Sequence, residues 1–342
     1  MMYSFRNDYS EGALPEIMEI LCATNLEQTP GYGCDDYCKE AAERIRECIQ
    51  APEAAVHFLV GGTQTNQTAL AAFLRPYQAV IGADTAHINV HETGAIEATG
   101  HKVLTVVSDD GKLTPAQIES VVAVHEDEHM VQPKAVYVSD STEVGTIYTK
   151  QELEALSECC KRLKLYFYLD GARLASALTC KENDVTLADL ARLTDAFYIG
   201  GTKNGALFGE ALVIVNKDLQ ENFRYHIKQR GGMLAKGRLL GLQFKTLFTD
   251  DLFFKAAKHA NEAAERIRSA FLAKQVPFLA DSPTNQLFPI VTAEQKEKLA
   301  EQFIFEKTKE LEDGRTAIRF VTSFATKKED VDALVQAISE IF

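Results

Sequence analysis

The chain has 342 residues, and its 49 Asp and Glu against 36 Lys and Arg give a formal net charge of −13. A chain of this length can hold one large domain and a smaller one, with a sizeable core. Because it has no basic stripe and no Lys/Arg cluster interleaved with aromatic residues, we expect no nucleic-acid partner.

The cysteines and the N-terminus exclude further classes of protein. Seven cysteines stand at positions 22, 34, 38, 48, 159, 160 and 180, an odd number without a paired C-x-x-C framework. Neither a disulfide scaffold nor a zinc site is therefore expected. The first residues form no apolar signal segment, and no stretch approaches the roughly 20 apolar residues of a membrane span. We expect reduced thiols, no bound metal, no membrane contact and a cytoplasmic location.

Short apolar runs alternate with helical patterns over the first 235 residues. The strand candidates are residues 54–60, 80–82, 103–107, 135–138, 166–169 and 211–215. Buried strands between helices indicate a mostly parallel α/β sheet. Such a sheet binds ligands at the carboxyl ends of its strands.

The pattern changes near residue 235 to long helices, over residues 237–249 and 251–274. Strand candidates near 286–291 and 317–321, and a final helix over 328–341, indicate a smaller α+β region. We therefore predict the α/β class, with an N-terminal segment at residues 1–20, a large domain at 21–245 and a small C-terminal domain at 246–342.

Two strand ends carry the residues that predict the chemistry. One apolar strand ends in Asp170, and a second apolar stretch runs through Gly200-Gly201-Thr202 to Lys203. Pyridoxal phosphate is an electron sink only while its ring nitrogen is protonated, and a neighbouring carboxylate keeps it so. Its aldehyde needs a lysine whose pKa the surroundings lower. Each residue alone is more simply a helix cap or a surface lysine, but together they predict a pyridoxal phosphate site.

A glycine turn earlier in the chain is suited to the phosphate. Gly61-Gly62-Thr63 follows the strand candidate at 54–60 and leads into a helical pattern over residues 67–74. Backbone N–H groups and the positive end of the helix dipole attract an anion there. The turn lacks the spacing of nucleotide-binding loops, so its position in the chain order is what supports this role.

These motifs, in this order, resemble those of the low-specificity threonine aldolases, pyridoxal phosphate enzymes of the aspartate-aminotransferase-like fold (fold type I). The resemblance covers essentially the whole chain. It is most specific at Asp170-Gly-Ala-Arg173, Thr202-Lys203, Gly231-Gly-Met233 and Ile318-Arg-Phe-Val-Thr322.

The resemblance implies a role for each matching residue. The cofactor residues are Gly62 and Thr63 at the phosphate, His87 stacked on the ring, Asp170 at the ring nitrogen, Lys203 in the Schiff base, and Thr202 as a second phosphate contact. Arg173 and Arg319 would clamp the substrate carboxylate, which matches the planar fork of a guanidinium.

The catalytic base stays open between His87, His129 and a water that they position. His129 matches a family histidine near the substrate hydroxyl, and His125 competes for that alignment. The acidic segment that contains both otherwise has the composition of a solvated surface loop.

Several positions depart from the family pattern. Asn7, which we assign to substrate binding, replaces a serine that helps hold the carboxylate, and Leu234 replaces an arginine that reaches the neighbouring subunit's phosphate. Lys236 is a candidate substitute for that arginine, and the segment around Asp140 also differs. These departures surround the substrate more than the cofactor.

We therefore predict a pyridoxal-phosphate-dependent carbon–carbon lyase that cleaves β-hydroxy-α-amino acids, most simply L-threonine or L-allo-threonine to glycine and acetaldehyde. The alternatives are a β-eliminating or aminotransferase-like enzyme on the same residues and, ranked lower, a non-catalytic protein that binds the cofactor or an amino acid. The fold also implies a homo-oligomer, dimer or tetramer, with shared active sites. Tyr32 and residues 231–233 are the candidates for cross-subunit contacts.

Overall fold

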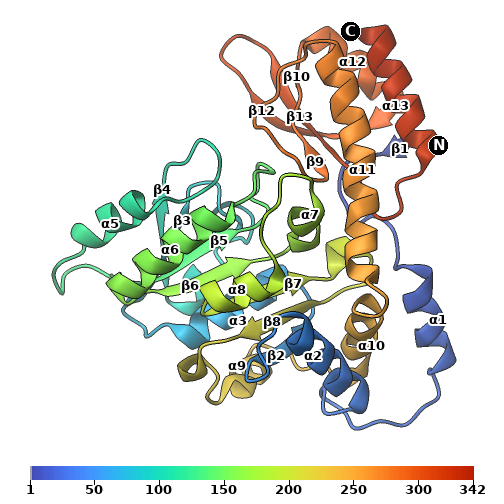
Figure 1. The fold of residues 1–342 in the computed structure, drawn as a ribbon. Coiled ribbons are helices and arrows are strands. Elements are labelled where there is room, and N and C mark those ends of the chain that lie inside the picture. The colour runs from blue at the N-terminus through green and yellow to red at the C-terminus, as the bar shows by residue number, and fades with distance from the viewer. Residues whose placement is uncertain (1) are drawn as a thin grey trace.

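The computed structural model describes residues 2–342. Two bodies of unequal size are joined by one long helix, α11 (Leu252–Ala273) (Figure 1). This helix contributes Phe253 and Ala257 to the hydrophobic core of the larger body and Ile267 and Phe271 to that of the smaller one. The expected domain limits at residues 20/21 and 245/246 stay a prediction.

A seven-stranded sheet forms the centre of the larger body, in the order β2-β8-β7-β6-β5-β3-β4. Its strands are β2 (Ala55–Leu59), β3 (Gln78–Ala83), β4 (Lys102–Val106), β5 (Gln132–Ser139), β6 (Tyr166–Asp170), β7 (Ala196–Gly200) and β8 (Glu210–Ile214). The neighbours from β7 through β4 are parallel, whereas β8 is antiparallel to both β7 and β2. The prediction of a mostly parallel sheet is confirmed.

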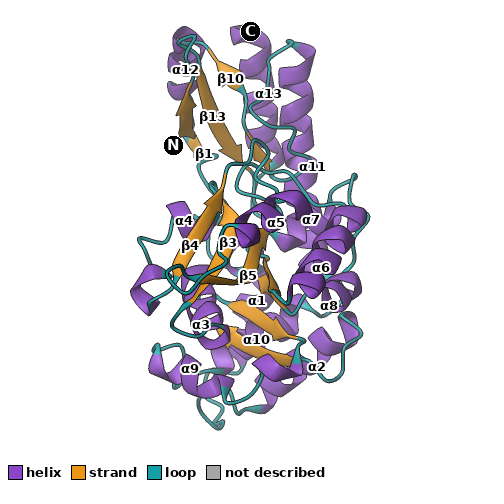
Figure 2. Ribbon diagram, turned by 90° about the vertical axis from the view of Figure 1, so that its left-hand side faces the viewer, coloured by secondary structure: helices purple, strands orange, loops and turns teal. Residues whose placement is uncertain are grey.

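Helices cover both faces of this sheet, as Figure 2 shows. Those on one side are α6 (Lys150–Leu163), α7 (Leu174–Thr179) and α8 (Leu187–Leu193), and those on the other include α3 (Gly62–Phe73) and α9 (Phe223–Gln229). The remaining helices of this body are α1 (Pro15–Ala23), α2 (Asp36–Cys48), α4 (His87–Val90), α5 (Pro115–Ala123) and α10 (Arg238–Leu247), with short 3₁₀ turns η1 (Glu97–Thr99), η2 (Thr202–Asn204) and η3 (Lys217–Leu219). Strands covered on both faces need apolar side chains in both directions, which explains their continuous apolar runs.

The smaller body has its own antiparallel sheet around β13 (Thr316–Val321), with β10 (Ile290–Val291) and β12 (Glu306–Glu310) beside it and β9 (Gln286–Leu287) also paired to it. Strand β1 (Tyr3–Ser4) runs parallel to β11 (Phe303–Ile304), so the chain passes through this body before it enters α1 of the larger one (Figure 1). Helices α12 (Ala293–Ala300) and α13 (Lys328–Ile341) pack with α11 over it.

Most of the expected elements are present, with three differences. The helix after the glycine turn begins at Gly62 itself rather than at residue 67. The strand candidate at 286–291 is two short strands, because Phe288 and Pro289 separate β9 from β10. The sequence patterns did not predict α1, α2, β11 or β12, which are short or carry mostly polar side chains.

All seven cysteines are free thiols. Within residues 2–342, no helix is both long enough and apolar enough to cross a membrane.

Candidate active site

A cavity of about 330 Å³ opens at the carboxyl edge of the large sheet. The residues expected to hold the cofactor all line it: Gly62, Thr63, His87, Asp170, Thr202 and Lys203. Arg173 lines it as well. Strands β5 and β6 end side by side, with Ser139 opposite Asp170, which explains why distant parts of the chain meet here.

Asp170 is 3% exposed, and donors surround its carboxylate. The hydroxyl of Tyr137 donates to Oδ2 at 2.6 Å, and Asn66 Nδ2 donates to the same oxygen at 2.9 Å. The backbone N–H of Ala172 donates to Oδ1 at 3.0 Å. These three donors hold the carboxyl group in a fixed orientation, and a carboxylate is the group that keeps a neighbouring ring nitrogen of the cofactor protonated.

A chain of hydrogen bonds connects Asp170 to His87. Asn66 Nδ2 also donates to Glu92 Oε1 at 2.8 Å, and that oxygen lies 2.8 Å from His87 Nδ1. The amide oxygen of Asn66 accepts from the hydroxyl of Tyr168 at 2.9 Å, which fixes the orientation of the amide. These partners orient His87, the first residue of α4, at the wall of the cavity.

Lys203 is the buried amine of the site. Burial lowers the pKa of Lys203, and the positive charge of Arg173 lowers it further, whereas Asp8, Asp170 and Glu210 oppose the shift. Burial disfavours the ammonium because charge is costly away from water. A lysine with a lowered pKa has the free amine that a Schiff base requires.

The N-terminus of α3 forms the anion-binding end of the cavity. The N-cap Gly61 offers no side chain to the helix, so the first backbone N–H groups of α3 stay available. A Cβ at Gly62 would lie 2.9 Å from the hydroxyl oxygen of Tyr198, which explains why a glycine is needed there. These groups fit a phosphate at a helix N-terminus.

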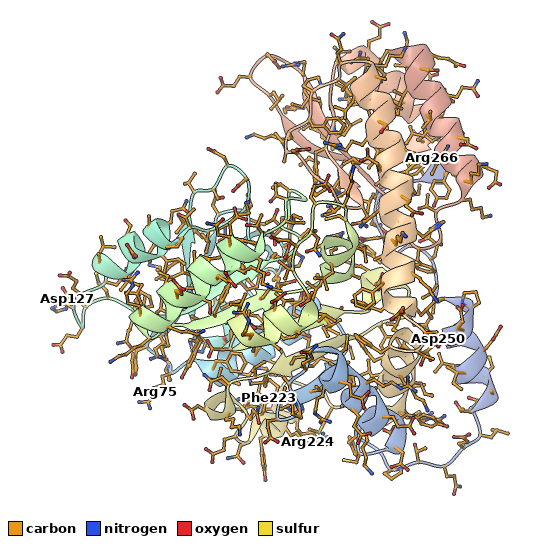
Figure 3. The ribbon with its side chains drawn as sticks, viewed as in Figure 1. Arg75, Asp127, Phe223, Arg224, Asp250 and Arg266 are labelled. Carbon is orange, nitrogen blue, oxygen red and sulfur yellow. The ribbon has the colours of Figure 1, made fainter. Side chains whose placement is uncertain are left out.

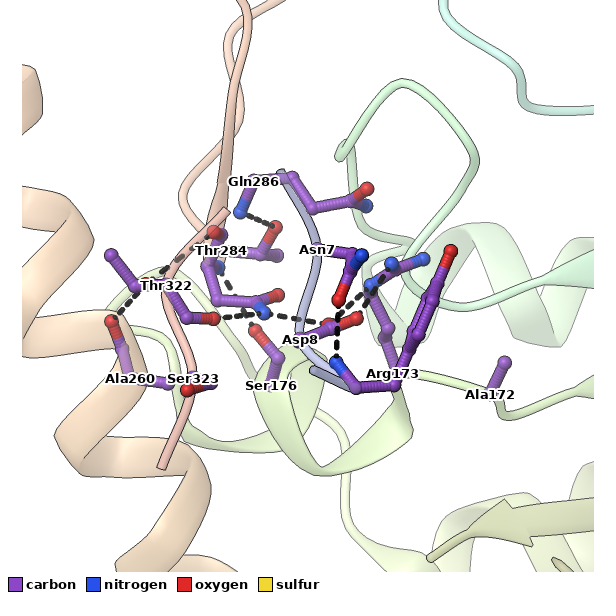
Figure 4. A network of polar contacts seen from close by, with 12 residues as sticks. Asn7, Asp8, Ala172, Arg173, Ser176, Ala260, Thr284, Gln286, Thr322 and Ser323 are labelled. Carbon is purple, nitrogen blue, oxygen red and sulfur yellow. Dashed lines mark hydrogen bonds and ion pairs between the residues drawn. The ribbon is translucent and has the colours of Figure 1, made fainter. Parts of the chain in front are cut away.

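Arg173 is already paired within the chain. Its Nε and Nη2 donate to the two carboxylate oxygens of Asp8 at 2.7 and 2.9 Å, and the Asp8 side chain is 1% exposed (Figure 4). Asn285 Nδ2 donates to Asp8 as well, at 2.9 Å. Asp8 therefore fixes the guanidinium at the cavity and connects it to the smaller body.

Arg319 lies on β13 and does not line the cavity of the larger body. It forms an ion pair with Glu306 on β12, and its Nη2 also contacts the carbonyl oxygen of Arg6 at 3.4 Å. Its Nε is buried without a hydrogen-bond partner among the described residues. Burial lowers the pKa of Arg319, and the nearby charge of Arg173 lowers it further. The charges of the two guanidinium groups therefore act on each other across the boundary between the two bodies.

The two remaining expected residues lie elsewhere. Asn7 Oδ1 accepts from the backbone N–H of Tyr9 and from Ser10 Oγ, so it shapes the N-terminal segment beside Arg173 (Figure 4). His129 is exposed between α5 and β5, and its backbone N–H donates to Asp127 Oδ1 at 2.9 Å. Asp127 lies at the outer edge of the larger body (Figure 3), so the structure does not bring His129 to this cavity of the same chain.

The sequence reasoning missed several residues that line the cavity. Glu143 accepts from the backbone N–H of His87 at 2.9 Å, and burial raises the pKa of Glu143. Tyr9, Tyr198 and Glu210 also line the cavity. Among these residues, only Glu210 was recognisable from the sequence, because it is an acidic residue at the start of an otherwise apolar strand.

The geometry fits pyridoxal phosphate at each of its reactive parts: Asp170 for the ring nitrogen, Lys203 for the aldehyde and the N-terminus of α3 for the phosphate. A structure of aspartate aminotransferase from Thermus thermophilus superposes with a TM-score of 0.73 at 13% identity, over 100% of this chain and 92% of that one, which shows a common fold. Fold and site together define a pyridoxal-phosphate-dependent enzyme of the aspartate-aminotransferase-like fold, a lyase within that class.

Residues 4–294 match the model of the beta-eliminating lyase family, and the chain belongs to this family. It is 36% identical to the low specificity L-threonine aldolase of Pseudomonas aeruginosa over 277 residues, 80% of this chain and 79% of that protein. A threonine aldolase structure from Leishmania major superposes with a TM-score of 0.98 at 49% identity, over 99% of both chains.

Proposed function

We propose that this chain cleaves the Cα–Cβ bond of β-hydroxy-α-amino acids, with L-threonine and L-allo-threonine as the simplest substrates and glycine and acetaldehyde as products. One observation supports the proposal: the side chains of Lys203, Asp170, His87 and Arg173 line a single cavity. The names of the relatives in Pseudomonas aeruginosa and Leishmania major support the choice of reaction.

The arginines orient the substrate. Arg173 has its Nε and Nη2 on Asp8, so its remaining N–H groups are free to meet a carboxylate that Arg319 binds from the smaller body. Two guanidinium groups around one carboxylate fix its direction as well as its position. The orientation that the arginines give the carboxylate would decide which bond at Cα is presented to the cofactor and therefore which reaction follows.

His87 is the base that the geometry favours for the β-hydroxyl proton. Its Nδ1 lies 2.8 Å from Glu92 Oε1, a contact suited to an N–H on Nδ1. In that tautomer Nε2 carries the lone pair that accepts a proton from a hydroxyl within the cavity. His129 lies at the surface, so a catalytic role for it requires a second copy of the chain to bring it to this cavity.

The cofactor supplies the electron sink for the bond that breaks. Lys203 would provide the amine that holds the cofactor. Asp170 would keep the proton on the ring nitrogen, and the N-terminus of α3 would hold the phosphate. Thr202 is expected to contribute a hydroxyl at the same end.

Release of acetaldehyde from L-threonine and L-allo-threonine tests the proposal, with Lys203→Ala as the matched blank. Release that disappears in the variant is the expected result. Cofactor binding without acetaldehyde from either isomer, or from larger β-hydroxy amino acids, would contradict it.

A β-elimination is the second candidate, because the matching family model describes a beta-eliminating lyase. It uses the same Lys203 and Asp170 but loses a leaving group from Cβ. Amino acids with such a group and no β-hydroxyl distinguish the reactions, since elimination releases ammonia and a 2-oxo acid but no aldehyde. The substrate with the larger kcat/KM decides between them.

A homo-oligomer with shared active sites is also proposed, in the cytoplasm. Lys228 lies 4.7 Å over the ring of Tyr32, which is 46% exposed, and Tyr32 and Met233 line one surface cavity. This neighbourhood supports a shared interface. Light scattering of the purified protein measures the assembly, and a fully active monomer would contradict the shared site.

A further inference from the structure

Glu210 stands between the two turns that form the anion-binding end of the cavity. As the first residue of β8, it pairs with Leu59 at the end of β2 and with Gly200 at the end of β7. The chain continues from Leu59 into Gly61 and Gly62, and from Gly200 into Thr202 and Lys203. Glu210 is 4% exposed and lines the cavity. An acid at this place is unexpected, because an ionised carboxylate repels a phosphate.

The contacts of Glu210 connect it to Thr202. Glu210 Oε1 lies 2.9 Å from Thr202 Oγ1, and Oε2 accepts from the backbone N–H of Gly201 at 3.1 Å. Thr202 Oγ1 in turn accepts from the backbone N–H of Gly209 at 3.0 Å. The carbonyl oxygen of Gly209 lies 3.5 Å from Thr202 Oγ1, at the limit of a hydrogen bond. Thr202 therefore has one fixed donor on its oxygen, one carboxyl group beside it and one more distant carbonyl group.

The protonation state of Glu210 decides where the hydroxyl of Thr202 points. A hydroxyl has one proton to donate and two lone pairs to accept with. If Glu210 is ionised, Thr202 must donate its proton to it and has none left for an anion. If Glu210 is neutral, it donates to Thr202 Oγ1, whose own proton then turns into the cavity.

We propose that Glu210 is a positioning residue for the cofactor phosphate: in its neutral form it donates to Thr202 Oγ1 and directs the Thr202 hydroxyl toward the phosphate. The inference concerns the cofactor alone and holds whichever substrate the chain cleaves. It also reconciles a buried acid with a phosphate site, because the acid is neutral when the phosphate is bound.

Burial supports the neutral form, since it raises the pKa of Glu210 to about 8. The hydrogen bond with Thr202, the charge of Lys203 and the backbone N–H of Gly201 oppose this shift, whereas the charge of Asp170 adds to it, and burial outweighs them. The phenols of Tyr168 and Tyr198 also face it and stay neutral, because burial raises the pKa of both well above 10. From β2 and α3 the neighbouring residues are Leu59, Gly61 and Gly62, which carry no titratable side chain.

The test compares pyridoxal phosphate with pyridoxal, which has the same ring and aldehyde but no phosphate. The dissociation constants of both for the full-length chain, freed of cofactor, are measured by absorbance at pH 7 and pH 9. Any effect of Lys203 is common to both ligands, so the ratio of the two affinities reports on the phosphate alone. A phosphate monoester has its second pKa near 6 and keeps its charge over this range.

We expect the preference for pyridoxal phosphate over pyridoxal to fall about tenfold from pH 7 to pH 9 in the unmodified chain, because only the neutral fraction of Glu210 supports binding. Glu210→Gln keeps a donor on Thr202 at every pH, so its preference should stay at the pH 7 value. Thr202→Val removes the hydroxyl, and its preference should be low at both pH values.

Asp140→Asn is the matched control, because burial also raises the pKa of Asp140 to about 8. The preference for pyridoxal phosphate should still fall from pH 7 to pH 9 in this variant. A pH-independent preference in the unmodified chain overturns the proposal without any variant. The proposal is also overturned if the preference still falls between pH 7 and pH 9 in Glu210→Gln. If it still falls in Thr202→Val, Glu210 does not act through Thr202.

Discussion

Two sides of the molecule, Asp170 with Asn66 on the larger body and Gln286 with Arg319 on the smaller body, differ in how completely their buried polar atoms are paired. On the larger body, both oxygens of Asp170 and every polar side-chain atom of Asn66 have hydrogen-bond partners. On the smaller body, the amide nitrogen and oxygen of Gln286 and the Nε of Arg319 are buried without a partner in the described part of the chain. The surroundings of Asp170 are thus largely prearranged, although Glu92 Oε2 and Ser141 Oγ are also buried without a partner, whereas Gln286 and Arg319 keep several unused hydrogen-bonding atoms.

Strand geometry explains why these unpaired groups gather on one surface. Gln286 pairs with Val321 across β9 and β13, and Arg319 precedes Val321 by two residues, so all three side chains lie on the same face. Residues on the other face, Ile318 and Phe320, pack into the core of the smaller body. Figure 4 shows the Gln286 side chain extending toward Arg173 and Asn7. An incoming carboxylate would satisfy groups that cost stability while unpaired.

The largest expected effect concerns the paired side. Asp170→Asn keeps the shape but removes the charge that holds the ring proton, so kcat should fall on the order of 10²–10⁴-fold. Steady-state kinetics at saturating cofactor measure the loss. Asp195→Asn is the control, because Asp195 accepts from the backbone of Phe167 at the far end of the strands. A similar loss in both variants would mean that the effect is structural.

Next in size is the buried ion pair that joins the two sides. Asp8→Ala leaves Arg173 buried and unpaired, which should lower the free energy of unfolding by about 3–5 kcal/mol. Urea denaturation measures it. Glu294→Ala removes the exposed partner of Lys298 and should change little, because water and salt screen such a pair. Equal changes in the two variants would show that burial does not decide the value of the pair.

The same substitution should have opposite effects on stability at two buried glutamines. Gln286→Leu removes two unpaired polar atoms, so the free energy of unfolding should rise by about 1–3 kcal/mol while glycine binds more weakly. Gln78→Leu, which breaks the bonds of Gln78 to Gln132 and to the backbone of Arg75, should destabilise. Calorimetry and glycine titration give both quantities. A loss of stability in Gln286→Leu would remove the contrast between the two sides.

The smallest predicted effect concerns how the free energy of unfolding decreases at acidic pH. Burial alone would raise the pKa of Asp8, but the charges of Arg173 and Lys203 prevail and lower it from 3.8. The pair therefore contributes its full stability above about pH 4–5 and loses it as the pH falls through the folded pKa, by at most about 1.4 kcal/mol per pH unit. In Asp8→Asn, the free energy of unfolding, measured by urea titration, should depend less on pH between pH 5 and about 3. An unchanged slope would contradict the lowered pKa.

Much of the site was predictable because its chemistry lies at strand ends. Asp170 and Lys203 close two apolar runs, and parallel strands bring such ends together. The family resemblance added His87 and the arginines. The pairing of Arg173 with Asp8 was not predictable from spacing, since 165 residues separate them. Nor was the bond from Glu210 to Thr202, which forms because β8 runs back antiparallel to β7.

The fold shows the same division between local and tertiary information. Buried strands and the amphipathic final helix have strong local patterns, and the structure has them where the sequence indicates. Strand β12 is exposed along its whole length, so it has no alternation of apolar and polar residues from which a strand could be predicted. It forms because β13 offers a partner, which only the tertiary structure reveals.

The central claim is that Lys203 holds the cofactor on the paired side of the cavity. Borohydride reduction of the protein with bound pyridoxal phosphate, followed by peptide mass spectrometry, tests it most directly. The prediction is a single adduct on the peptide that contains Lys203. An adduct on another lysine, or none, would contradict the claim.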